Sequence, residues 1–188
     1  MSGNLDEQTE MSGRPDAGKR RRDGRAPRNP LKRLASQAGG LRALCAGIEA
    51  LSGRYSVADL DAFVIRLLHD LPLHFADESD DLLPLLSLRA HRDDDVSHVV
   101  ETMTANHRDA VIEIRRLRPR VEALRLMGGA PADDPSLGTG LDGLLARLRH
   151  HLSLEIAVIL PIARLRLTED DLRHMAAGMA ARRKAAGI

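Results

Sequence analysis

The amino-acid sequence predicts an all-α protein, an up-down four-helix bundle with a short fifth helix at the C-terminus. Three observations lead to this prediction. Apolar residues recur at steps of three and four along four long segments, no segment alternates apolar and polar residues as a strand does, and glycine and proline gather between the segments. The chain has 188 residues, 43% of them hydrophobic, so we expect a single folded domain with a core of ordinary size.

The first 28 residues differ in composition from the rest of the chain. They hold few large apolar residues and are rich in Gly, Arg, Asp and Pro, so they cannot bury enough surface to offset the entropy of ordering. We expect 1–28 to be a disordered basic tail and 29–188 to be the folded domain. Within the tail, Lys19–Arg28 carries six basic residues and one acidic residue. This run could contact nucleic acid or an anionic surface, or simply be a solvated tail.

The first two helices follow the tail. One begins at Asn29-Pro30, a capping residue followed by proline at the first helical position, and the Gly39-Gly40 pair should weaken it. Its apolar face is Leu31, Leu34, Ala38, Leu41, Cys45 and Ile48. Ser56 can cap the second helix. The face of the second helix is Leu60, Phe63, Leu67, Leu71, His74, Glu78, Leu82 and Leu85.

Three further helices follow the loop at Leu88–Asp95. The third has the face Val96, Val100, Met103, His107, Ala110, Ile114, Leu117, Val121 and Leu124. We expect Gly128–Gly140 to be a turn-rich connection to the fourth helix. The face of the fourth helix is Leu144, Leu148, His151, Glu155, Ile159 and Ile162. A capping box, Thr168 with Asp171, opens a fifth helix that runs to about Lys184.

Five ionisable residues lie on these apolar faces: His74, Glu78, His107, His151 and Glu155. A buried, unpaired carboxylate is costly, so each of the two glutamates needs a partner. The spacing His-x-x-x-Glu places both side chains on one face of a helix, and it occurs twice. The two copies belong to a longer internal repeat, in which residues 74–86 align with residues 151–163 and a proline follows each glutamate by six residues.

A metal ion would give these groups a common partner, because imidazole and carboxylate together suit iron, zinc or manganese. The alternative is a buried His/Glu network that is hydrogen-bonded without a metal. The other five histidines lie off the apolar faces or in loops, and we expect them to be solvated: His69, His91, His98, His150 and His174. Cys45 lies on the first apolar face and is expected to be a small core residue.

The motifs that carry these residues resemble a known family. They are HFADESDDLLPLL from His74, NHRDAVIEI with His107, and HHLSLEIAVILPIARLRLTEDDL with His151. Their order is similar to that in the hemerythrin HHE cation-binding domain of the bacterial single-domain type, and the likeness extends over about Asn29 to Arg183. The resemblance implies a four-helix bundle that holds two non-haem irons. It implies that Glu78 and Glu155 bridge the metals, that His107 and His151 ligate one iron, and that His74 ligates the other.

The sequence departs from the family pattern at three positions. The family's histidine on the first helix is Ala38 here, and the neighbouring Gln37 should point about 100° away from that face. Met103 stands where oxygen carriers have a histidine, and Phe75 where some members have a glutamate. Fewer protein ligands mean weaker metal binding or additional water ligands. We therefore do not expect reversible oxygen carriage by an ordinary di-iron centre.

Three functions fit these features. The first is a metal-binding protein with one or two irons, zinc or manganese being possible substitutes, that senses oxygen, nitric oxide or redox state or handles iron. The second is a metal-free regulatory or interaction bundle derived from the same family. The third is a peroxide-degrading or oxidase di-iron enzyme, for which the sequence specifies no substrate; we lean against an enzyme. A single cysteine, no signal peptide and no apolar stretch of about 18 residues predict a cytoplasmic protein without a membrane span.

Overall fold

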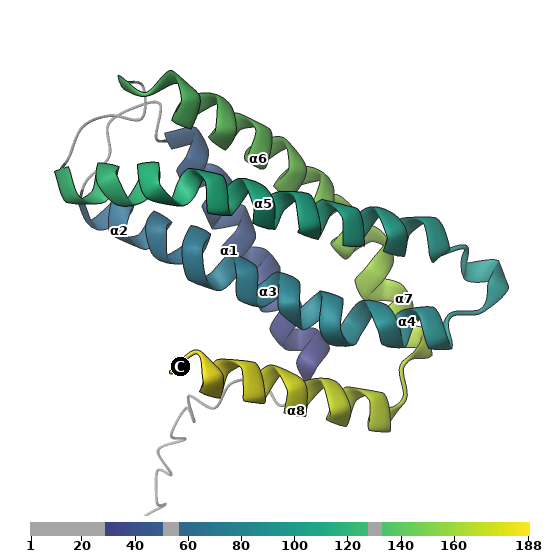
Figure 1. The fold of residues 1–188 in the computed structure, drawn as a ribbon. Coiled ribbons are helices and arrows are strands. Elements are labelled where there is room, and N and C mark those ends of the chain that lie inside the picture. Colours follow the sequence, from purple (N-terminus) through teal and green to yellow (C-terminus); the bar gives the residue numbers. More distant parts are fainter. Residues whose placement is uncertain (1–28, 51–56, 128–132) are drawn as a thin grey trace, which may run out of the picture.

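The computed structural model describes residues 29–50, 57–127 and 133–188, and these residues form a helical bundle without a β-strand (Figure 1). Four rods make up the bundle. They are α1 (Pro30–Ala50); α2 (Val57–Ile65), α3 (Leu71–Asp77) and α4 (Leu83–Arg89) in one line; α5 (Ser97–Met127); and α6 (Pro135–Leu154) with α7 (Leu160–Arg166). The expected basic tail, with Lys19–Arg28, and the expected cap at Ser56 lie outside the described residues.

Successive rods run in opposite directions, as Figure 1 shows. Helix α1 contacts both α2 and α6, and α5 contacts the same two helices, so α1 and α5 occupy opposite corners of the bundle. A fifth helix, α8 (Glu169–Ala185), lies across the outside of the bundle against α1 and α3. The predicted all-α bundle with a short C-terminal helix is confirmed. None of the described helices is long and apolar enough to cross a membrane.

The caps predicted for α1 and α8 are present. The side chain of Asn29 accepts a hydrogen bond from the Lys32 amide at 3.2 Å, before Pro30. At α8, the Asp171 amide donates to the Thr168 hydroxyl oxygen at 3.2 Å, and the Thr168 amide donates to the Asp171 carboxylate at 2.9 Å. Because each cap satisfies backbone groups that the helix itself leaves free, the chain enters α1 and α8 where the sequence predicts.

Helix α6 begins earlier than the sequence predicted. The expected connection Gly128–Gly140 ends sooner, because the side chain of Asp134 caps the helix by accepting from the amides of Ser136 and Leu137 at 3.0 and 3.1 Å. Glycines therefore lie inside the helix, and one of them has a packing reason. A β-carbon on Gly140 would lie 2.5 Å from Cδ2 of the buried Leu117, so glycine allows α5 and α6 to approach closely.

Wide π-helical turns interrupt the second and fourth rods. They span Arg66–Asp70, Glu78–Leu82 and Glu155–Ile159, and each is followed by a helix whose second residue is a proline. A proline ring clashes with the carbonyl four residues earlier in a regular α-helix. Here the residue before each proline instead bonds the carbonyl five residues earlier, as the Leu160 amide does with Glu155.

These turns change which residues face the core. Each π turn accommodates one additional residue, so the buried face shifts by one position beyond it. The sequence predicted Leu85 and Ile162 on the buried faces, but both are only partly buried. Leu86 and Ala163 are the fully buried residues instead. The prediction was wrong by the same single residue in both halves of the internal repeat, because both halves contain the turn.

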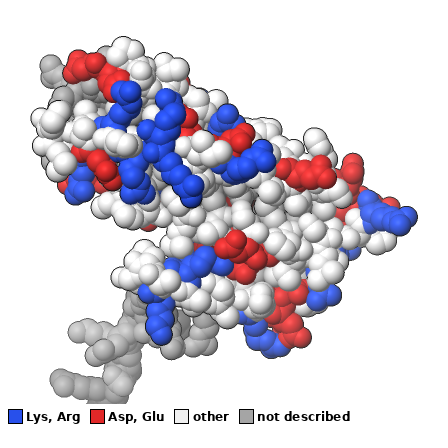
Figure 2. Space-filling view, viewed as in Figure 1, with Lys and Arg blue, Asp and Glu red and all other residues white. Residues whose placement is uncertain are grey.

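The core consists of two apolar clusters. One contains Leu31, Leu34, Leu82, Met103 and Ile159, among others, and lies at the end of the bundle where α4 meets α7. The other contains the apolar residues toward the opposite end. Along each rod except α1, the residues that separate the two clusters are buried and ionisable. The bundle therefore has a polar layer across its middle. On the surface seen in Figure 2, acidic and basic side chains are interspersed.

We predict that replacing Gly140 with alanine lowers the free energy of unfolding. Overpacking against Leu117 costs about 1–3 kcal/mol, which exceeds the roughly 1 kcal/mol that alanine gains over glycine as a helix former. Gly143→Ala, on the same helix with no atom near its β-carbon position, should raise the stability instead. Urea denaturation of both variants tests the close approach of α5 and α6; equal effects would contradict it.

Candidate metal centre

The five ionisable residues predicted from the sequence meet in the polar layer. His74 lies in α3, His107 in α5 and His151 in α6, while Glu78 and Glu155 are the first residues of two π turns. None of the five is more than 4% exposed. The predicted convergence is thus observed. That these residues ligate a metal remains a prediction.

One carboxylate oxygen lies at the centre of the cluster. The Nε2 atoms of His107, His74 and His151 lie 3.1, 3.3 and 3.4 Å from Oε2 of Glu78. The Nε2 atoms of His74 and His151 are also 3.2 Å apart. Three imidazoles from three different rods therefore point the same ring nitrogen at a single oxygen.

The second carboxylate faces the same space from the fourth rod. Oε2 of Glu155 lies 3.9 Å from Nε2 of His74 and 3.8 Å from Nε2 of His151. One ligand atom from each of His74, Glu78, His151 and Glu155 can be chosen so that all four lie within 4.8 Å of one another. His107 joins this group through its contact with Glu78. All four rods border the layer, but only three of them supply these residues.

Several buried atoms of the cluster lack a hydrogen-bond partner among the described residues. They are both carboxylate oxygens of Glu78 and of Glu155, Nε2 of His107 and Nδ1 of His151. Buried polar atoms are normally paired, and each one left without a partner costs about 1–3 kcal/mol. Of these atoms, Oε2 of Glu78, Oε2 of Glu155 and Nε2 of His107 lie where the imidazole nitrogens converge, so one cation placed there could bind all three.

Burial disfavours the charged forms of all five side chains. It lowers the pKa of His74 to about 3, with the neighbouring His107 adding to the shift, and lowers the pKa of His107 to about 4. Burial also lowers the pKa of His151 well below its ordinary value. It raises the pKa of Glu155 to about 9, helped by the charge of Glu78, and raises that of Glu78 well above its usual range. A cation would reverse the preference of both carboxyl groups.

The spacing of the donor atoms fits a shared metal ion. Two atoms that each lie about 2.1 Å from one ion, at bond angles near 90–109°, are roughly 3.0–3.4 Å apart. The three separations between Oε2 of Glu78 and the imidazole Nε2 atoms, and the separation between Nε2 of His74 and Nε2 of His151, are 3.1–3.4 Å. Neutral imidazoles with carboxylates are a donor set that iron, zinc and manganese accept. The residues present therefore fit a divalent metal.

Neighbouring side chains fix the orientation of His107 and His151. The ring of Phe75 stacks on that of His107, with centroids 4.5 Å apart and an interplanar angle of 23°, and meets His151 edge-on at 5.3 Å. The hydroxyl of Ser79 lies 2.7 Å from Nδ1 of His107, so it can fix which ring nitrogen carries the proton. Phe75, at the position where some relatives have a glutamate, thus forms an aromatic wall of the layer.

Gln37 is a functional neighbour that the sequence prediction missed. We expected its side chain to point away from the site, but its Oε1 lies 3.3 Å from Nδ1 of His74, and its Nε2 donates to Asp77 at 3.2 Å. Its flexible side chain reaches back around α1, which a count of 100° per residue does not capture. Ala38 is buried in the apolar core, as expected, and Met103 is fully buried.

Asp77 and two arginines of α8 were also missed. Asp77 is completely buried next to Glu78 and forms ion pairs with Arg182 and Arg183. Burial disfavours its charge, but hydrogen bonds from Arg183, Arg182 and Gln37 outweigh burial and hold its pKa below the ordinary value. The only signal in the sequence was an acidic residue directly before Glu78, and nothing local indicated that α8 would supply its partners.

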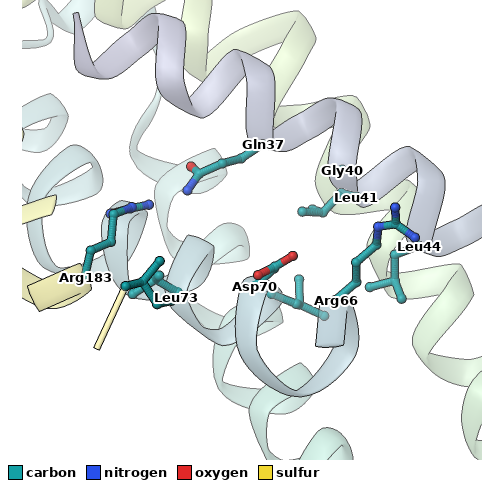
Figure 3. A pocket seen from close by; sticks show the side chains of 10 residues that line it. Gln37, Gly40, Leu41, Leu44, Arg66, Asp70, Leu73 and Arg183 are labelled. Carbon is teal, nitrogen blue, oxygen red and sulfur yellow. The ribbon is translucent and has the colours of Figure 1, made fainter. Parts of the chain in front are cut away.

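A cavity of about 210 Å³ opens beside these residues, between α1, the second rod and the end of α8 (Figure 3). Leu41, Leu44 and Leu73 contribute apolar walls, and the amide of Gln37 and the guanidinium of Arg183 point toward each other at one side. His74 itself does not line the cavity, and Gln37 is the lining residue that contacts it. By contrast, the five histidines expected to be solvated are all exposed, and Cys45 is buried in the core.

The fold and the cluster together define a four-helix-bundle protein with a buried His/Glu layer able to hold a metal ion. A family model, the hemerythrin HHE cation-binding domain, matches residues 29–163. The chain belongs to this family. Neither a search of curated proteins nor a search of solved structures gave a significant match. Helix α8 lies entirely beyond the matched residues.

We predict that the metal-free protein loses stability as the pH rises from about 7 to about 9. In this range Glu155 stays protonated in the folded state, because its pKa is about 9, whereas the unfolded chain has released the proton. The histidines do not contribute above about pH 7, since they are neutral in both states. Urea unfolding in the presence of a chelator measures the slope. Glu78, whose pKa is also raised, contributes in the same direction, so Glu155→Gln should reduce the slope without removing it, and an unchanged slope in this variant would contradict the assignment.

Proposed function

We propose that this protein binds non-haem iron in the polar layer of its bundle, through His74, Glu78, His107, His151 and Glu155. The observation that carries the proposal is the convergence of buried donor atoms on Oε2 of Glu78, at separations of 3.1–3.4 Å and with both glutamates lacking hydrogen-bond partners. Membership in a cation-binding family supports the same conclusion.

The donor set favours iron over a structural metal. Structural zinc sites are closed and tetrahedral, usually with cysteine ligands, whereas this layer contains imidazole and carboxylate and no cysteine. Three imidazoles and two carboxylates with open positions are typical of non-haem iron. Zinc and manganese use the same donors and would compete for the site.

One iron held tightly is the arrangement that the side chains support best. All three imidazole Nε2 atoms lie around the same oxygen of Glu78, which leaves few donors for a second ion beside Glu155. A second iron would need water in place of the protein ligand that Ala38 does not supply. Vacant positions would allow a small molecule such as oxygen or nitric oxide to reach the metal, so we propose sensing of these molecules or of iron supply in the cytoplasm.

We predict one to two irons per chain when untagged protein is purified from iron-replete cells. His151→Ala should remove most of the iron, because it deletes one of the three imidazoles, while His150→Ala, the exposed neighbour, should not. Elemental analysis and the absorption spectrum measure this. The protein should also gain roughly 5–10 °C in Tm at a ferrous iron concentration of about 100 Kd. Wild-type protein that binds no iron, zinc or manganese would instead favour the metal-free regulatory bundle.

We predict that Ala38→His increases the iron content or affinity, because it restores an imidazole on α1 next to the polar layer. Ala38 is 1% exposed and directly follows Gln37, which contacts His74. The matched control is Ala35→His, at an exposed position one turn earlier, which should leave the metal content unchanged. If Ala38→His only destabilises the protein, the register that places Ala38 at the family's first ligand is wrong.

A further inference from the structure

We propose that Gln37 and Asp77 position His74 for metal binding, and that Arg182 and Arg183 hold both in place, so that helix α8 is a functional part of the metal centre. This inference rests on the proposed function and adds residues that lie outside the cluster itself. It also adds an element, α8, that lies beyond the residues matched by the family model.

The first contact concerns the ring of His74. Its Nε2 faces Glu78 at 3.3 Å, while its Nδ1 faces Oε1 of Gln37 at 3.3 Å. A histidine can bind a metal through Nε2 only if that nitrogen is unprotonated, so the proton of the neutral ring must be on Nδ1. An amide oxygen is an acceptor only. Gln37 therefore favours the ring form that leaves Nε2 free for the metal.

The second contact fixes which way the Gln37 amide faces. Its Nε2 donates to Oδ2 of Asp77 at 3.2 Å. Because a carboxylate can only accept, the amide nitrogen must face Asp77 and the amide oxygen must face His74. Asp77 thus determines the orientation of the Gln37 amide. The amide in turn determines which ring nitrogen of His74 carries the proton.

The third set of contacts comes from α8. Asp77 accepts from Arg182 Nε at 2.9 Å and from Arg183 NH2 at 2.6 Å, and Arg182 also binds Asp81 in the π turn that begins with Glu78. A fully buried carboxylate needs such partners to remain ionised. Without the two arginines, the Asp77 carboxylate would lose the contacts that hold it beside the Gln37 amide, and Gln37 would lose the partner that fixes its orientation.

The close approach of α8 makes these contacts possible. A β-carbon at Gly178 would lie 2.6 Å from Oδ2 of Asp81, so glycine at this position lets the helix reach the π turn. The beginning of α8 is attached separately, through the ion pair of Arg89 Nε with Asp171 at 2.9 Å. The two ends of α8 are therefore held by different ion pairs, and only the pairs at its C-terminal end connect to His74.

His74 is the member of the cluster that this network controls. His107 is held by Ser79 and Phe75, which belong to the second rod, and Nδ1 of His151 has no hydrogen-bond partner among the described residues. In the part of the chain that the structure describes, α8 thus acts on one imidazole of three. Removal of its influence should weaken metal binding without abolishing it.

The experiment titrates the full-length, metal-free protein with cobalt(II), whose visible absorption reports ligand geometry. Gln37→Leu should weaken cobalt binding about 10- to 100-fold and change the spectrum, since loss of a partner behind a metal-bound histidine has effects of this size. Gln37→Glu keeps an oxygen acceptor toward His74 but replaces the donor to Asp77 with a second carboxylate, so its affinity should fall less than that of Gln37→Leu. Gln37 is partly exposed, so both variants should fold, which the Tm of the metal-free proteins checks.

Variants of the arginines test the contribution of α8. Arg183→Gln should weaken cobalt binding in the same direction as Gln37→Leu, whereas Arg89→Gln, which removes the ion pair at the other end of α8, should leave affinity and spectrum unchanged. If wild-type protein binds cobalt and Gln37→Leu binds it with the same affinity and spectrum, the inference is overturned while the proposed function stands. If wild-type protein binds neither cobalt nor iron, both are overturned.

Discussion

The arrangement of side chains in the middle of this bundle depends on two buried carboxyl groups that need partners. Glu78 and Glu155 are completely buried, and burial raises the pKa of both. A bundle of this size could fill the same layer with leucine at lower cost, since unpaired buried polar groups destabilise a fold. The three imidazoles that surround Glu78 provide a donor set rather than a closed hydrogen-bond network. The apolar clusters on either side of the layer supply the stability that such a layer requires.

The π turns place the two glutamates in that layer. Two of the three described π turns begin with a glutamate of the internal repeat and end just before the helix that carries the proline, so the proline and the carboxylate belong to one local unit. Because the turn is wider than an α-helical turn, the rod is able to present the histidine before it and the core leucines after it on the same side of the bundle. The repeat seen in the sequence is therefore a repeated local structure, a π turn that buries a carboxylate.

Helix α8 gives the site a supporting layer from outside the four rods. Its arginines neutralise Asp77 and Asp81 on the outer face of the second rod, directly behind His74 and Glu78. The sequence indicated that α8 exists, from its capping box, but gave it no role. Arg182 and Arg183 are more than 100 residues away from Asp77 in the chain. Two basic residues at the C-terminal end of a helix are usually explained by their favourable interaction with the helix dipole alone.

The sequence by itself determined the helices, the caps of α1 and α8 and the five residues of the layer, because periodicity and spacing depend on local geometry and on the cost of burying charge. It could not determine the register beyond the π turns, the early start of α6 against Leu117, or the direction of the Gln37 side chain. The π turns and the Asp134 cap are local features that apolar periodicity does not reveal, whereas the direction of the Gln37 side chain depends on how α1 packs against the second rod. Only the tertiary structure decided that three imidazoles surround one oxygen of Glu78 and that α8 reaches His74, since those contacts join residues that are distant along the chain.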